Sequence, residues 1–83
     1  MEPKFDKGDY IVNRWANNYA IVDSVTKKGY YHFKVYYDES YDELRDTKDK
    51  MSDLQVNYQK FWDFCTDEEK EKLDKILKEK GRK

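Results

Sequence analysis

The alternation of apolar and polar residues changes along this chain, from a two-residue period in its first half to a longer period in its second. Residues 10–15, 19–26 and 30–38 are rich in aromatic and β-branched side chains, and short turn signals separate them. We predict that these three runs are β-strands. Because their connections are only about three residues long, they are expected to form an antiparallel meander.

The third predicted strand has aromatic side chains on both of its faces. Successive side chains of a strand point to opposite sides, so alternate residues share a face. The expected core face consists of Tyr31, Phe33, Val35 and Tyr37. The even-numbered positions from 30 to 36 point the other way, where another element covers them or they form an exposed contact surface.

A short motif precedes the first strand. It is Phe5-x-x-Gly8-Asp9, and it continues into apolar runs at 10–12 and 19–25. This series, over residues 5–37, resembles the start of small SH3-like barrel proteins of phages and mobile elements. The resemblance implies a binding module and not an enzyme. It carries over no functional residue, because that group has no shared catalytic motif.

The segment 38–53 differs in composition, with seven acidic and three basic residues. We predict a turn at 38–40, followed at 41–47 by either an edge strand or a single helical turn. Charged side chains on an edge strand discourage pairing with other chains. The β-rich part of the domain is therefore expected to span residues 5–47.

From residue 51 the apolar residues follow a helical spacing. The residues on this face are Met51, Leu54, Tyr58, Phe61, Trp62 and Cys65. We favour a helix here, capped by Ser52 or Asp53, because the spacing continues for four turns. The alternative is a last strand at 54–58, followed by a short helix that holds Phe61 and Phe64.

A second helix is predicted at 67–80. Thr66 and Glu69 have the spacing of a capping box, and Gly81 suits the C′ position. The apolar stripe is short, and its burial contributes at most about 5–8 kcal/mol. We therefore expect this helix to dock lightly, on the sheet or on a second chain. The stripe consists of Leu73, Ile76 and Leu77.

Composition limits the classes of protein to which the chain could belong. The 83 residues suffice for a single domain, and aromatic residues at 17% supply a small core despite 42% charged residues. The net charge of −1 lacks the basic surplus of a dedicated nucleic-acid binder. A single cysteine excludes an intramolecular disulfide. Without a recognisable signal peptide or long apolar run, we expect a cytoplasmic protein that does not enter a membrane.

The residues available for catalysis are few. The chain has one histidine, one cysteine and no glycine-rich loop, and nothing in the spacing of His32 and Cys65 supports a nucleophile–base pair. The acidic segment lacks the glycine and the ligand spacing of a calcium loop. We therefore predict no enzyme activity, no metal and no cofactor. Cys65 is expected to be a small buried hydrophobe.

Two groups of residues are candidates for partner contact. The first combines aromatic and basic side chains, which suit a protein interface or stacking on single-stranded nucleic acid. It consists of Tyr30, His32, Lys34, Tyr36, Arg14 and Trp15. The second offers negative charge to a basic partner. It consists of Asp38, Glu39, Asp42, Glu43 and Asp46.

The sequence thus predicts a single α+β domain, with an SH3-like sheet or partial barrel over residues 5–47 and a helical segment over 51–80. The expected function is binding to another protein, in a small phage-type accessory protein or an inhibitor that occludes its partner. The alternative is a small barrel that binds nucleic acid. We expect a monomer, or a weak homodimer formed through the last helix.

Overall fold

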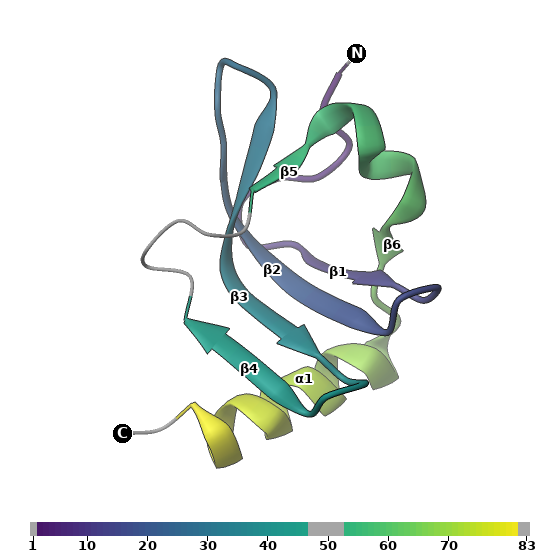
Figure 1. Ribbon diagram of the computed structural model, residues 1–83, viewed down its shortest axis with the longest axis vertical. Coiled ribbons are helices and arrows are strands. Elements are labelled where there is room, and N and C mark those ends of the chain that lie inside the picture. Colours follow the sequence, from purple (N-terminus) through teal and green to yellow (C-terminus); the bar gives the residue numbers. More distant parts are fainter. Residues whose placement is uncertain (1, 47–52, 82–83) are drawn as a thin grey trace.

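A computed structural model describes residues 2–46 and 53–81 of the chain. The domain is α+β, as predicted, and within these residues it consists of a six-stranded antiparallel sheet followed by one α-helix (Figure 1). Each of the three predicted strands is present, and residues 43–46 form a fourth. In chain order the elements are β1 (Tyr10–Asn13), β2 (Asn18–Val25), β3 (Tyr30–Asp38), β4 (Glu43–Asp46), β5 (Asp53–Gln55), the 3-10 helix η1 (Val56–Phe61), β6 (Asp63–Phe64) and the α-helix α1 (Asp67–Lys80).

The sheet is an open one with the strand order β4-β3-β2-β1-β6. The long strand β3 is paired along one edge with β2. Its other edge is shared, because β4 pairs with residues 35–38 and β5 with residues 30–32. The turns between strands use positive φ at Gly29 (90°) and Asn17 (57°), two residue types that tolerate this conformation.

The helix that we favoured from residue 51 is wrong, and the alternative is closer to the structure. A three-residue strand, β5, is followed by η1. The buried side chains of this segment are Val56, Gln59 and Trp62, which recur every three residues, the period of a 3-10 helix. Because one of these positions is polar, the spacing of the apolar residues favoured Tyr58 and Phe61 as core positions instead. Both side chains are exposed. The proposed start and cap at residues 51 and 52 lie outside the described residues.

The four expected core residues of β3 do pack in the interior: Tyr31, Phe33 and Tyr37 are buried, and Val35 packs against a core. The expectation that they share one face is wrong, because the pairing of β2 and β3 contains two bulges. Lys34 is an extra residue on β3, and Asp23 is an extra residue on β2. Each extra residue reverses the alternation of the side chains that follow it. As a result, Phe33 and Val35 point to opposite sides of the sheet, and Val25 joins the side of Phe33.

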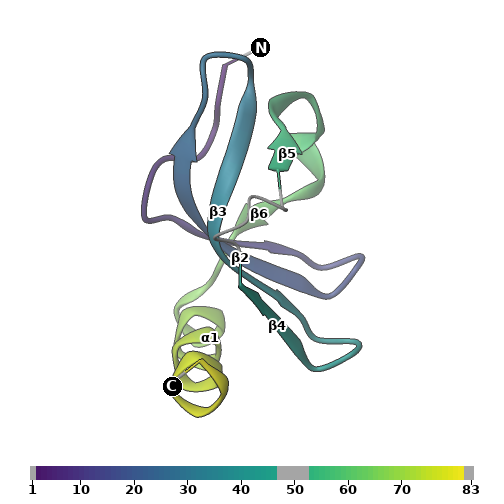
Figure 2. The ribbon, with the colours of Figure 1, turned by 60° about the vertical axis from the view of Figure 1, so that its left-hand side comes forward.

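The domain therefore has two separate cores, one on each side of the sheet. The inner core lies within the bend of the β2–β3 ribbon, between the strands and η1 (Figure 2). It consists of Phe5, Ile11, Ala20, Val22, Tyr31, Phe33, Val56 and Trp62. The helix-side core lies beneath α1, on the outer side of the bend. It consists of Val12, Tyr19, Ile21, Tyr37, Cys65 and Leu73.

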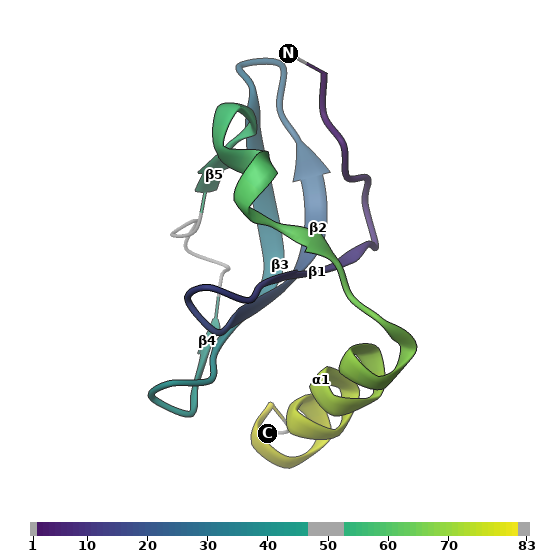
Figure 3. The ribbon, with the colours of Figure 1, turned by 90° about the vertical axis from the view of Figure 1, so that its right-hand side faces the viewer.

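A buried polar network ties the N-terminal segment to η1. The Gln59 side chain accepts hydrogen bonds from the Tyr31 hydroxyl and, at 2.7 Å, from the backbone N–H of Lys4, and it donates to the backbone oxygen of Glu2 at 2.8 Å. The backbone N–H groups of Lys4 and Phe5 also approach the Tyr31 hydroxyl, at 2.8 and 3.2 Å. Residues 2–5 thus close the inner core from one side and are hydrogen-bonded to η1, and Figure 3 shows this N-terminal segment in purple beside β2.

The C-terminal helix has the predicted bounds and the predicted capping box. The Thr66 hydroxyl accepts from the N–H of Glu69, and the Glu69 carboxylate accepts from the N–H of Thr66. The helix docks on the sheet, through fully buried Leu73 and half-buried Ile76 and Leu77. Gly81 ends it with a φ of −86°, so the expected left-handed C′ conformation is not used. None of the helices in the described part of the chain is long and apolar enough to span a membrane.

Candidate functional site

The aromatic and basic positions of β3 do not form the single surface that we expected. The Tyr36 ring stacks on Phe33 at 5.9 Å, on the inner-core side, and burial raises the pKa of its hydroxyl. The exposed Lys34 is the bulge residue. The half-buried His32 is paired with β5. The Tyr30 hydroxyl accepts a hydrogen bond at 3.0 Å from Gln55. These side chains are divided between two faces and offer no continuous platform.

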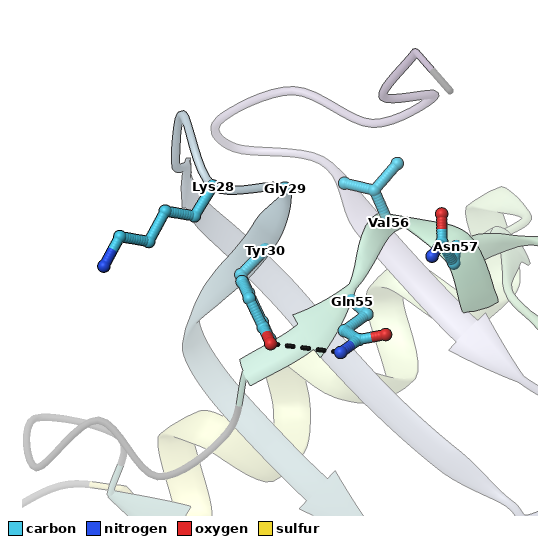
Figure 4. Close-up of a pocket in the computed structure, with 6 residues that line it drawn as sticks. All are labelled: Lys28, Gly29, Tyr30, Gln55, Val56 and Asn57. Carbon is cyan, nitrogen blue, oxygen red and sulfur yellow. Dashed lines mark hydrogen bonds between the residues drawn. The ribbon is translucent and has the colours of Figure 1, made fainter.

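A polar hollow lies beside Tyr30, where the β2–β3 turn meets the start of η1. Its volume is about 260 Å³. In Figure 4 the Lys28 side chain points away from the Tyr30–Gln55 hydrogen bond, and the Asn57 side chain lies on the far side of Val56. The polar groups do not converge on one point, so the hollow lacks the arrangement that fixes a ligand.

Arg14 and Trp15 lie at the other end of the β2–β3 ribbon from Tyr30. They belong to the β1–β2 turn, and β2 begins there opposite Asp38. The Arg14 guanidinium binds both carboxylate oxygens of Glu69, at 2.8 and 3.1 Å. This contact raises the pKa of Arg14 and lowers the pKa of Glu69. Arg14 therefore attaches α1 to the sheet.

The acidic candidates are largely paired within the domain. Glu39 forms an ion pair with Lys72 at 2.5 Å. Asp42 accepts from the Tyr37 hydroxyl at 2.5 Å and pairs with Lys80 at 3.0 Å. The hydrogen bond to Asp42 raises the pKa of Tyr37 to about 12.

The other acidic candidates engage groups close to them in the chain. Asp38 accepts from the N–H of Ser40 at 3.1 Å, and Glu43 lies 3.7 Å from Arg45. The side chain of Asp46 lies outside the described part of the structure. An acidic surface for a basic partner remains a prediction, but its charge is partly neutralised by α1.

A different group of aromatic residues is freely accessible. Trp15 is 94% exposed, Phe61 57% and Tyr58 53%. Trp15 and Phe61 line a shallow hollow of about 350 Å³, together with Asn13 and Ala16. Its wall comes from the β1–β2 turn on one side and from the end of η1 on the other. We call Trp15, Tyr58, Lys60 and Phe61 the Trp15–Phe61 surface.

This surface is held by the local backbone on both sides. The Asn13 side chain accepts hydrogen bonds from the N–H groups of Trp15 and Ala16, at 3.1 and 3.3 Å. On η1 the rings of Tyr58 and Phe61 are stacked with centroids 6.5 Å apart, and the Lys60 ammonium lies 5.4 Å from the Phe61 ring. Sequence reasoning identified Trp15 as a contact residue. It placed Tyr58 and Phe61 in the core because it took a 3-10 helix for an α-helix.

The groups that could carry catalysis are not arranged for it. Burial raises the pKa of the Cys65 thiol to about 11, whereas a nucleophilic cysteine needs a lowered pKa. Cys65 lies in the helix-side core, and its N–H donates to the backbone oxygen of Tyr10. Among residues 2–46 and 53–81, no group of three or more His, Cys, Asp or Glu side chains is placed to hold a metal ion.

Comparison with known proteins gives no match: no family model, curated protein or solved structure resembles this chain significantly.

Proposed function

We propose that this domain is a non-enzymatic protein-binding module, and that the Trp15–Phe61 surface is its contact site. The observation that carries the proposal is the exposure of Trp15, at 94%, opposite Phe61 across an apolar hollow. Large aromatic side chains gathered on one exposed patch are typical of interaction sites. Tryptophan and tyrosine also supply much of the binding energy of protein interfaces.

The shape of the hollow favours a side chain of a partner over a free small molecule. Four residues line it, and its volume is at the low end of the range for small-molecule pockets. Lys60 beside Phe61 adds a positive charge. The partner that suits this site presents one large apolar side chain next to an acidic residue.

The resemblance of residues 5–37 to small SH3-like barrels implies a binding module, and it therefore favours the same type of function. We infer that the protein acts by occupying a surface of its partner, as a small accessory protein or inhibitor of phage type does.

The test is affinity capture from a lysate of the native host, followed by measurement of the affinity for the captured protein. Trp15→Ala and Phe61→Ala are each expected to weaken binding by at least tenfold, as interface hot spots do. Tyr41→Ala is the matched control, because Tyr41 is 78% exposed but lies on the β3–β4 turn. Equal binding by all three variants and the parent protein would exclude this site.

Binding to nucleic acid is the competing outcome, because bases also stack on exposed aromatic rings. Labelled single-stranded DNA and RNA are titrated at low salt and again at moderate salt. Phosphate contacts would make the affinity fall steeply with salt. Oligonucleotide binding that is lost in both Trp15→Ala and Lys60→Ala would replace the protein-contact proposal. We expect no binding at either salt concentration.

A further inference from the structure

The helix α1 covers an apolar face of the sheet with little apolar surface of its own. Leu73 is its only fully buried side chain among the described residues, and Ile76 and Leu77 are half-buried. The sheet presents a larger apolar face beneath it. The buried residues of that face are Val12, Tyr19, Ile21 and Tyr37.

Among residues 2–46 and 53–81, three ion pairs hold the helix at its start, middle and end. Their side chains are between 20% and 66% exposed, so dissolved salt screens them. They reach two turns of the sheet, β1–β2 and β3–β4. The pairs are Arg14–Glu69 at 2.8 Å, Glu39–Lys72 at 2.5 Å and Asp42–Lys80 at 3.0 Å.

The helix and the inner core have few contacts in common. The inner core and the helix-side core share no buried residue, and they lie on opposite sides of the sheet. Only Cys65 and Thr66 separate β6 from α1. Besides the ion pairs, α1 is held by the buried Leu73 and by a hydrogen bond of 2.6 Å from the Tyr10 hydroxyl to Asp74. An element with so few buried contacts opens more readily than the rest of a domain.

We propose that α1 is a releasable cover, and that the sheet face beneath it is a second interaction surface that accepts an amphipathic helix from a partner. The seated α1 shows that the face fits a helix. Its charges set the direction of that helix, with an acidic residue near the N-terminus to meet Arg14 and basic residues further on to meet Glu39 and Asp42. A partner helix with a longer apolar stripe would displace α1.

Release is measured through Cys65, the only cysteine of the chain, which is buried beneath α1. The full chain is labelled with an uncharged alkylating reagent, at low salt and in about 1 M sodium chloride, where the screening length falls to about 3 Å. We expect salt to accelerate labelling severalfold. Emission from buried Trp62, recorded in a Trp15→Phe background, is expected to remain unchanged, because the inner core stays folded.

Two lysine variants with the same charge change separate the ion pair from a general charge effect. At low salt Lys72→Gln, which removes the pair with Glu39, is expected to label about two- to fivefold faster than the parent. Lys75→Gln is the control, since the exposed Lys75 side chain forms no ion pair or hydrogen bond with residues 2–46 or 53–81, and it is expected to label like the parent. Equal rates in Lys72→Gln and Lys75→Gln, or a change in Trp62 emission together with labelling, would overturn the releasable cover.

The second half of the proposal is tested with a synthetic peptide. The probe has the sequence of residues 66–81 with Lys70→Leu, which lengthens the apolar stripe by one helical turn. Its affinity for the full chain is measured by fluorescence anisotropy. Because the peptide binds only when α1 is released, Lys72→Gln should bind it more tightly than the parent, by the same factor that labelling accelerates.

Faster labelling of Lys72→Gln without tighter peptide binding would contradict the proposal that the sheet face is a second interaction surface. It would still support the proposal that α1 is a releasable cover. Neither Cys65 labelling nor peptide binding reports on contact at Trp15 or Phe61, which lie on other elements, and the Trp15→Phe background only removes the emission of the second tryptophan. A failure here therefore leaves the proposed contact site intact, and the reverse also holds.

Discussion

The two sides of the sheet are sealed in different ways. The inner core is closed by the N-terminal segment and by η1, and the buried Gln59 fastens residues 2–5 to η1 through backbone groups. The helix-side core is closed by one helix, which side-chain ion pairs hold at partly exposed positions. One sheet thus has one face that is difficult to open and one face whose cover responds to salt.

The difference follows from where the hydrogen-bonding groups lie. A buried network in a region of low dielectric is costly to break, because each lost partner leaves an unsatisfied group. An exposed ion pair contributes little, because water and salt compete for both charges. The two faces should therefore respond differently to mutation, salt and pH.

The largest effect is expected from Phe33→Ala. Phe33 contacts the rings of both Tyr36 and Trp62 in the inner core. Loss of a buried phenylalanine side chain should lower the free energy of unfolding by about 3–5 kcal/mol. Urea denaturation followed by Trp62 fluorescence measures it. A loss below about 1 kcal/mol would contradict the assignment of this cluster as the main core.

Leu73→Ala should have a smaller and more local effect. Removal of the fully buried Leu73 side chain costs about 2–3 kcal/mol, within the range for leucine in a core, but only the docking of α1 depends on it. Hydrogen exchange should show loss of protection in α1 and retained protection in β2. If both elements lose protection equally, the two cores unfold as one unit.

Gln59→Leu tests the buried network directly. The change leaves the N–H of Lys4 and the Tyr31 hydroxyl without their shared acceptor, and should cost about 1–3 kcal/mol. Gln55→Leu is the matched control, because the Gln55 side chain is only half-buried and bonds to Tyr30, whereas Gln59 is buried and joins three residues. The urea concentrations at the denaturation midpoints of the two variants are compared. Similar losses of stability would mean that the buried network of Gln59 contributes no more than an ordinary hydrogen bond.

Changes in pH should act first on the helix side. Hydrogen bonds from Arg14 lower the pKa of Glu69, and those from Tyr37 and Lys80 lower the pKa of Asp42. A carboxyl group with a lowered folded pKa stabilises the fold above its ordinary pKa, and this contribution is lost as the pH falls through the folded value. Labelling of Cys65 under acidic conditions, corrected for the intrinsic rate, should reveal release of α1 below about pH 4.

The smallest predicted effect is on the titration of Tyr37. Its pKa is raised to about 12 by the hydrogen bond to Asp42, so the stability from this contact is present below pH 10 and is lost as the pH rises through about 12. Asp42→Asn should bring the pKa of Tyr37 down toward its ordinary value of 10.0. Assigned NMR shifts of the Tyr37 ring measure the change, and an unaltered pKa would mean that burial is the cause.

Much of the fold follows from local signals in the sequence. The β-branched and aromatic run of β3, its flanking turns and the capping box of α1 each specify their own element, and all three lie where the sequence placed them. Their physical causes are local, because alternation and capping involve only a few neighbouring residues.

The errors in the sequence-based prediction arise where a single residue determines the geometry of many others. The 3-10 period of η1 was hidden because one of its buried positions is Gln59, whose polar groups are satisfied by distant backbone. Tyr58 and Phe61 were consequently placed in the core, and the exposed surface that they form with Trp15 was missed. The ion pairs of Arg14 and Lys72 also join residues far apart in the chain, so no local pattern could have shown them.

The bulges at Asp23 and Lys34 have a consequence for recognising relatives of this protein. Each bulge reverses the alternation of inward and outward side chains along its strand. Phe33 and Val35 therefore belong to different cores, although a single residue separates them. A relative that lacks the Lys34 bulge would need its apolar positions displaced by one place along the rest of the strand to fill the same two cores. Alignments of such sequences should therefore permit a one-residue gap at Asp23 and at Lys34, where the side chains are exposed and a change of length leaves the core composition intact.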